Sequence, residues 1–317
     1  MKIFKLILVG ALVLVLTAMQ SLQQEWDKEY ENINQPEEAI LANKQVIFVA
    51  GFLNELAELT VGYFSDSIEV AEKDFGAITS CICPSSKINV PDNAKIIYEQ
   101  IINIYNKNKL PIILVGHSKG AAEIEYLLYT NPQLITNHIV EQALFIQSAI
   151  LGSPLADRSD GCLLSMAIAL LSPNVETLKT SVCILNYQEA LRIFEEKLNK
   201  LSTNINTDKN ILKNNIISRM VYLCTETNSP KLSMGLEIVL GVLQDNLSRD
   251  NLKHDGLMPI ANQAHPDSLA FYLSNCDHAG PVLRKPLSNL SSKRRKALMR
   301  VGFKKLHELK LNYCNDF

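Results

Sequence analysis

The sequence predicts an α/β fold with a mostly parallel central sheet that is flanked by helices. Two short runs are almost entirely apolar, QVIFVAGF at 45–52 and LPIILVGHS at 110–118, as strands buried on both faces of a sheet must be. Segments with helical spacing of apolar residues separate these runs from further short apolar runs. Expected strands that alternate with expected helices favour a parallel sheet covered on both faces.

Composition sets the broad class. The chain has 317 residues, of which 47% are hydrophobic and 20% charged, which suits a globular protein with a sizeable core. The formal net charge of −2 at pH 7 gives no indication of a nucleic-acid partner. The seven cysteines form no disulfide framework, and Cys81 and Cys83 are too close in sequence for a common zinc pattern. We expect mostly buried thiols, with at most one or two bridges.

The N-terminus has the pattern of an export signal. MKIFKLILVGALVLVLTAMQS carries two lysines, then an apolar run, then small and polar residues, which predicts a signal peptide over residues 1–21. Secretion or a periplasmic location follows from that prediction. The alternative is an uncleaved membrane anchor, although the apolar stretch is short for a bilayer span. Residues 22–44 are polar and acidic and are expected to form a flexible lead-in or a surface helix.

Residues 45–317 are expected to form one domain. Its second strand is expected within residues 76–84, and the apolar spacing from Ile96 to Tyr105 predicts a helix over 92–109. The segment after residue 118 is helical until Asn131-Pro132. The remaining expectations are strands at 142–150 and 219–227, with a helical, irregular insertion lying over the sheet at about 158–217.

A serine stands between two glycines at the end of the 110–118 strand. The residues Gly116-His117-Ser118-Lys119-Gly120 fit G-x-S-x-G, and a strand before it with a helix after it is the context of a nucleophile elbow. A turn this tight needs small residues two positions either side of the serine. The following helix then aims its N-terminal N–H groups at the place where an oxyanion forms. The alternative is a plain turn between a strand and a helix.

A serine nucleophile needs a base and an acid that orients the base. In this architecture the chain order is serine, acid, histidine. His117 lies inside the elbow and His138 precedes the later strands, so the candidates for the base are His254, His265, His278 and His307.

The motifs GHSKG, DGLMP and DHAG, taken together, resemble α/β-hydrolase lipases and esterases, and among them bacterial triacylglycerol lipases. The resemblance covers roughly residues 45–282 and is tight only at the three motifs. It implies an α/β-hydrolase fold with a cap or lid insertion. It also implies that Ser118 is the nucleophile, His278 the base and Asp255 the acid.

The resemblance further places an oxyanion donor after the first core strand, which makes the backbone N–H of Phe52 one candidate and that of Lys119 the other. Lys119 stands where such proteins usually have a neutral residue, and its side chain is expected to point away or to pair with an acid. The calcium ligands of some of these lipases find no match in this sequence, and no cofactor or metal is expected.

Other interpretations remain open for three features. His254, Asp255, His265, Asp277 and His278 are close enough in sequence to form a metal site. Asp157, Asp245 and Asp250 are reserve candidates for the acid. The basic segment 293–309, with seven Lys or Arg, is either a final helix packed on the sheet or a helix that contacts an anionic membrane surface.

The function that follows is an exported serine ester hydrolase acting on lipid or other acyl esters. An acyltransferase or thioesterase with the same three residues is one alternative. A non-catalytic binding protein on the same fold is another.

Overall fold

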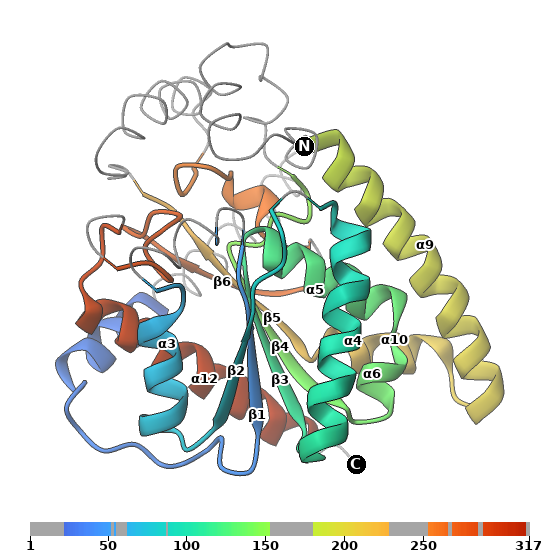
Figure 1. Ribbon diagram of the computed structural model, residues 1–317, viewed down its shortest axis with the longest axis horizontal. Coiled ribbons are helices and arrows are strands. Elements are labelled where there is room, and N and C mark those ends of the chain that lie inside the picture. Colours follow the sequence, from blue (N-terminus) through green and yellow to red (C-terminus); the bar gives the residue numbers. More distant parts are fainter. Residues whose placement is uncertain are drawn as a thin grey trace, which may run out of the picture.

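A computed structural model describes residues 22–51, 54, 62–86, 88–152, 180–227, 253–265, 268–284 and 288–314. Its centre is one parallel sheet of six strands in the order β2-β1-β3-β4-β5-β6 (Figure 1). The predicted parallel sheet is therefore confirmed. The strands are β1 Gln45–Val49, β2 Ile78–Ile82, β3 Ile112–His117, β4 Val140–Ile146, β5 Met220–Thr225 and β6 Leu269–Leu273.

The central strands are buried along almost their whole length. Every residue of β1, β3 and β5 is buried, whereas the edge strands β2 and β6 are partly exposed. Burial on both faces explains why the central strands are nearly continuous apolar runs without alternation. The register pairs Val49 of β1 with Gly116 of β3, and Gly116 with Phe145 of β4. The residues that follow β1, β3 and β4 therefore meet at one edge of the sheet.

Helices α4, α5 and α9 cover one face of the sheet (Figure 1). α4 (Val90–Asn108) is preceded by Asn89, whose side chain accepts the Asp92 N–H, and it is followed by Lys109, which has a left-handed backbone. Ile97 and Ile101 of α4 are fully buried against the sheet. α5 (Lys119–Thr130) follows β3 directly, and the short α6 (Gln133–Thr136) leads into β4.

The predicted insertion at 158–217 divides into two parts. Residues 158–179 lie outside the described residues. The remainder forms α9 (Thr180–Ile205) and α10 (Lys209–Ile217), and α9 packs along α5 with Tyr187, Phe194 and Leu198 in the core. These apolar residues recur at helical spacing, so this part belongs to the layer that flanks the sheet rather than to a cap over it.

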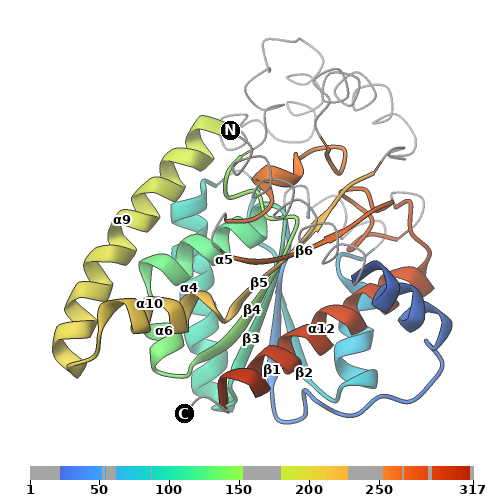
Figure 2. The same ribbon diagram turned by 180° about the vertical axis from the view of Figure 1, so that it is seen from behind.

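The opposite face is covered by α12 (Ser292–Cys314), α3 (Ser65–Glu69) and the helical residues 22–31, as the view from behind shows (Figure 2). One π-helical turn, Val70–Asp74, continues α3. Leu22 and Trp26 are buried in this face, and the Trp26 Nε1–H donates a 2.9 Å hydrogen bond to the Arg294 carbonyl. Part of the expected lead-in is thus a packed helix.

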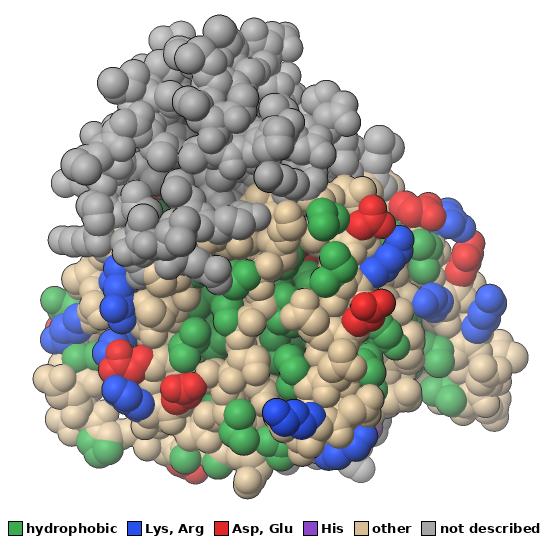
Figure 3. All heavy atoms as spheres, viewed as in Figure 1, with side chains coloured by type: hydrophobic (Ala, Val, Ile, Leu, Met, Phe, Trp, Pro, Cys, Tyr) green, Lys and Arg blue, Asp and Glu red, His purple; other side chains and the backbone are tan. Residues whose placement is uncertain are grey.

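The basic charges of α12 are matched by acids of the neighbouring segments. Arg295 and Asp66 form a buried pair at 2.6 Å. Although burial opposes ionisation, hydrogen bonds from Ser292 and Arg295 hold the pKa of Asp66 below its usual value. On the face of the molecule shown in Figure 3, exposed Lys and Arg side chains are likewise interspersed among Asp and Glu. Further pairs join Arg294 to Asp27, Lys296 to Glu69, Arg300 to Glu37 and Asp74, Lys304 to Glu29 and Glu37, and Lys305 to Glu25.

This pairing favours a packed helix over membrane contact for the basic segment. Leu298, Phe303 and Leu306 of α12 are fully buried against the sheet. Among the described residues, no helix combines the length and the apolar character that a membrane span needs.

Candidate active site

Ser118 lies on the sharp turn between β3 and α5. Its φ of 55° and ψ of −124° form a backbone conformation that non-glycine residues rarely adopt. A Cβ on Gly116 would lie 2.6 Å from Ala121 Cα, and one on Gly120 would lie 2.4 Å from the Ala50 carbonyl oxygen. Both glycines are therefore required by close backbone approach, as the elbow motif predicts.

The structure brings Ser118, His278 and Asp255 together. The Ser118 hydroxyl is 2.9 Å from His278 Nε2, and His278 Nδ1 is 2.8 Å from Asp255 Oδ2. Asp255 is completely buried, whereas Ser118 and His278 keep 8% and 7% of their surface exposed. With its Nδ1–H donated to Asp255, the imidazole presents Nε2 to the serine as an acceptor.

Asp255 is fixed by the turn that follows it. Its Oδ1 accepts the backbone N–H groups of Leu257 and Met258 at 2.9 and 2.8 Å, while Gly256 has a φ of 108°. The His278 N–H donates to the Asp255 carbonyl at 2.8 Å. One carboxylate oxygen is thus held by the turn, which leaves the other for the imidazole.

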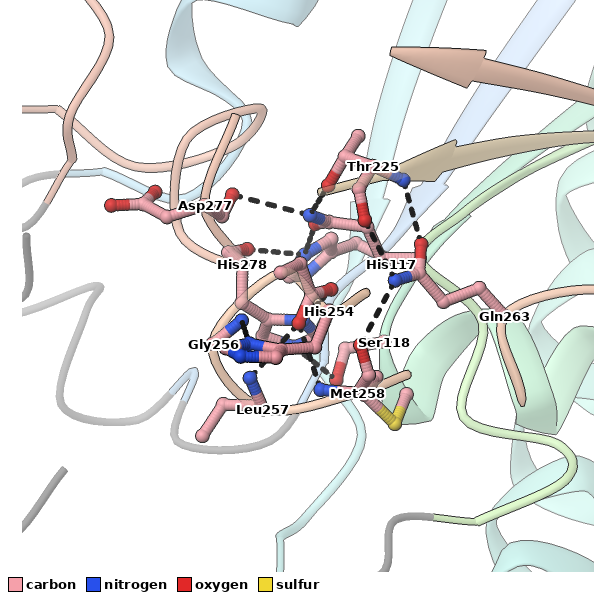
Figure 4. Close-up of polar contacts among 12 residues, drawn as sticks. His117, Ser118, Thr225, His254, Gly256, Leu257, Met258, Gln263, Asp277 and His278 are labelled. Carbon is pink, nitrogen blue, oxygen red and sulfur yellow. Dashed lines mark hydrogen bonds and ion pairs between the residues drawn. The ribbon is translucent and has the colours of Figure 1, made fainter. Parts of the chain in front are cut away.

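His117 connects the elbow to the loop of His278. The Tyr63 hydroxyl oxygen accepts the Gly51 N–H at 3.1 Å. Its O–H donates to His117 Nδ1 at 2.6 Å, because both partners of His117 Nε2 are acceptors and Nδ1 is therefore the acceptor nitrogen of the ring. The His117 Nε2–H donates to the His278 carbonyl at 2.9 Å (Figure 4). It also donates to Gln147 Oε1 at 2.9 Å. Burial, and secondarily the nearby His278, lower the pKa of His117 to about 3, so this ring stays neutral beside the base.

Three buried polar side chains complete the support of the His278 loop. Gln147, after β4, donates to Thr225 Oγ1 and to the Asp277 carbonyl. Gln263 bonds both the N–H and the carbonyl of Thr225, and it also donates to the Met258 carbonyl at 3.2 Å. This network joins the ends of β4 and β5 to the acid turn and the base loop (Figure 4). The sequence gives no signal for Gln147 and Thr225, which lie at strand ends, or for Gln263, which follows a short 3-10 helix, because isolated polar residues have no characteristic spacing.

Lys119 is the first residue of α5, so its backbone N–H has no acceptor within that helix. Its buried side chain pairs with Glu123 one turn later. Burial raises the pKa of Glu123 to about 7 against the opposing effect of Lys119. The Lys119 side chain was expected either to point away from the turn or to pair with an acid, and the structure shows the pairing. Phe52, the other expected oxyanion donor, lies outside the described residues.

The remaining candidates are placed differently. His254 Nδ1 accepts the Gly256 N–H at 3.0 Å, and His265 packs against the Tyr187 ring. Within the described ranges, no group of three or more His, Cys, Asp or Glu could hold a metal ion. Asp157, Asp245 and Asp250 lie outside those ranges. The Asp277 carboxylate points away from His278 in Figure 4.

Comparisons with solved structures identify the fold. A metagenomic carboxyl esterase superimposes with a TM-score of 0.60 at 23% identity, over 84% of this chain and 76% of that one. A mature Bacillus licheniformis lipase gives 0.54 at 17% identity, over 83% of this chain and 91% of the lipase. Lipase 1 from Pelosinus fermentans gives 0.50 at 14% identity, over 82% and 98%. No protein-family model and no curated protein sequence matches the chain.

The chain has the α/β-hydrolase fold, and its fold is similar to that of the esterase and the lipases compared with it.

Proposed function

We propose that this chain is an exported serine ester hydrolase that cleaves carboxylic esters of lipids or other acyl compounds. The observation that carries the proposal is the pair of hydrogen bonds joining Ser118 to His278 and His278 to Asp255. The fold similarity to a carboxyl esterase and to lipases supports the same class of reaction.

The reaction proceeds through an acyl-enzyme. His278 Nε2 accepts the hydroxyl proton while Ser118 Oγ attacks the ester carbonyl carbon, and Asp255 stabilises the imidazolium that forms. The imidazolium then protonates the leaving alcohol. Water, deprotonated by His278, attacks the acyl-enzyme and releases the acid.

The developing oxyanion is stabilised at the N-terminal end of α5. The Lys119 N–H belongs to the first turn of that helix, where unpaired donors and the helix dipole favour negative charge. The Phe52 N–H is the proposed second donor.

A fluorophosphonate probe and short p-nitrophenyl esters test the proposal together. We expect covalent labelling at Ser118 and ester turnover in the wild-type protein, with both lost in Ser118→Ala. Folded wild-type protein that neither reacts with the probe nor turns over any of these esters would contradict an enzymatic function and favour a binding protein.

Hydrolysis and acyl transfer differ only in the acceptor that attacks the acyl-enzyme. Product analysis with and without an added alcohol separates them, and a thioester substrate extends the same assay to thioesterase activity. We expect free acid as the main product. Export is proposed from residues 1–21, and N-terminal sequencing of the secreted or periplasmic protein tests it.

A further inference from the structure

Two cysteines stand together at the carboxyl end of the edge strand β2. Cys81 and Cys83 are both exposed, and their Sγ atoms are 3.8 Å apart. Ile82 between them is buried with 2% exposure. Side chains alternate along a strand, so the two thiols project from the same outer side while Ile82 points into the core.

This spacing permits a disulfide between the two residues. Cα atoms two apart in a strand are separated by about 6.6–6.8 Å, which is the upper end of the range that a disulfide spans. Bringing the sulfurs into bonding distance therefore draws Cys83 towards Cys81. Bridges that are strained and exposed are the ones that open readily by exchange.

The other cysteines with described side chains differ sharply from this pair. Cys224 and Cys276 are completely buried, and burial raises the pKa of each thiol well above its usual value. A thiol must be ionised and accessible to react with a disulfide. Exchange at Cys81 and Cys83 is thus favoured over exchange at Cys224 and Cys276.

We propose that Cys81 and Cys83 form a reversible dithiol–disulfide pair that reacts with small disulfides such as oxidised glutathione. One cysteine thiolate attacks the glutathione disulfide, forming a mixed disulfide and releasing one reduced glutathione. The second thiolate attacks the protein sulfur of that mixed disulfide and expels the second glutathione. The protein pair loses two electrons and two protons, and one glutathione disulfide becomes two glutathione thiols.

A short hydrogen-bond path links this pair to the candidate active site. Asn54 donates to the carbonyl of Pro84, which follows Cys83, at 2.7 Å, and to the Gly51 carbonyl at 2.9 Å. Asn54 is buried, so it has little freedom to follow a moving partner. Gly51 lies against Ser118, because a Cβ added to it would come 3.0 Å from the Ser118 Cβ. Closing the bridge moves Pro84 and therefore disturbs the segment that precedes Phe52.

Peptide mapping tests the chemistry without any assay of activity. Trypsin is expected to release residues 74–87, which contain both cysteines and no other. After treatment of folded protein with oxidised glutathione, we expect this peptide to be two hydrogen atoms lighter and resistant to alkylation. In Cys81→Ser or Cys83→Ser the same peptide should instead retain one glutathione. A wild-type peptide that stays fully reduced, or that keeps glutathione as the single variants do, overturns the proposal.

A second measurement tests the link to the active site, and this step rests on the proposed ester hydrolysis. We expect the closed form to turn over p-nitrophenyl esters at least about threefold more slowly than the reduced form, because small displacements of catalytic groups are costly. The variant Cys81→Ser/Cys83→Ser should be insensitive to the oxidant. Full closure with an unchanged rate overturns the link. Absence of turnover in both forms contradicts the proposed function and leaves the peptide result standing.

Discussion

The two halves of the candidate site are held in place by different means. The nucleophile half, from Gly116 to Gly120, is fixed by the backbone of β3 and α5, which leaves no room for a Cβ at either glycine. The half that contains Asp255 and His278 lies in irregular loops and is fixed by hydrogen bonds from buried side chains. Steric placement tolerates almost no substitution, whereas a hydrogen-bond network can lose one member and keep part of its geometry.

The largest effect is expected at Gly120. In Gly120→Ala the new methyl group overlaps two backbone carbonyls, those of Val49 and Ala50, which no side-chain rotation relieves. We expect the free energy of unfolding to fall by more than about 4 kcal/mol, and ester turnover to disappear with the fold. Urea unfolding measures the first quantity.

Gly302→Ala is the matched control for that substitution. Gly302 lies in α12, and the nearest atom to its added Cβ is a methyl carbon of Leu144 at 3.1 Å, which belongs to a side chain. Its unfolding free energy should stay within about 1 kcal/mol of wild type, since alanine favours the helix. A stable and active Gly120→Ala variant would contradict steric placement of the nucleophile.

The next effect is expected at Asp255, and it acts on chemistry rather than on folding. In Asp255→Asn the amide oxygen can still accept from Leu257 and Met258, but the amide group facing His278 no longer supports the imidazolium. We expect turnover to fall by roughly 10²–10⁴ with the unfolding transition retained.

Asp157→Asn and Asp245→Asn serve as comparisons and should stay within about tenfold of wild type. If either of these variants loses most of its turnover while Asp255→Asn keeps the wild-type rate, the assignment of Asp255 as the acid is wrong.

A smaller effect is expected from Tyr63, which acts through His117. Tyr63→Phe keeps the ring but leaves the Gly51 N–H and His117 Nδ1 without their partner. Unpaired buried groups cost about 1–3 kcal/mol each. We expect a drop of about tenfold in kcat with KM nearly unchanged, because the base loop shifts while the substrate surface does not.

Tyr105→Phe is the control for this change, since Tyr105 lies on α4 and contacts Lys109 through its ring face. It should leave both constants at the wild-type value. Equal kinetics for Tyr63→Phe and Tyr105→Phe would show that the path through His117 does not position the base.

Substitution of Glu125 in α5 is expected to have the smallest effect on activity of these changes. It is also expected to alter the dependence of stability on pH. Burial raises the pKa of this carboxyl from 4.5 to about 8, against the opposing effect of neighbouring hydroxyl groups, of which Ser148 donates a hydrogen bond to Glu125 Oε2 at 3.4 Å. The contribution of Glu125 to stability is therefore greatest below about pH 4.5 and falls between pH 4.5 and pH 8, the range in which this carboxyl is ionised in the unfolded state and protonated in the fold.

Glu125→Gln removes that dependence and keeps the shape of the protonated acid. Relative to wild type, we expect it to gain about 2–3 kcal/mol of unfolding free energy between pH 5 and pH 7, with ester turnover unchanged. Urea unfolding at four pH values measures this gain. The exposed Glu99→Gln should show no such trend, and a parallel pH profile for Glu125→Gln and wild type would mean that Glu125 is ionised in the fold.

Most of the strands, the helix α4 and the sharp turn at Ser118 could be predicted from the sequence, because they depend on the spacing of apolar residues and on the positions of glycines. β1, β3, β5 and α4 lie within or close to the predicted segments, and the G-x-S-x-G motif forms the expected sharp turn. The contact of Asp255 with His278 came from motif resemblance, and the structure contains it.

The placement of α9 and the roles of Tyr63 and Gln147 could not be predicted, because no local sequence pattern indicates them. The sequence predicts an insertion over the sheet where α9 lies, and only the packing of α9 on α5 shows that it belongs to the flanking layer. Tyr63 and Gln147 gain their roles from contacts across the fold, since His117 lies 54 residues from the first and 30 from the second.

The packing of residues 22–31 against α12 determines how late in synthesis this face of the sheet can finish folding. Trp26 and Arg294, which share a hydrogen bond, are separated by 268 residues. During synthesis, α4, α5 and the central strands have all emerged from the ribosome before α12 exists. Until then Leu22, Trp26 and the part of the sheet that α12 covers lack that partner, and contacts of such long sequence separation form slowly. This face of the sheet therefore stays incomplete until α12 has been synthesised, and its uncovered apolar residues are the expected site of chaperone binding during synthesis.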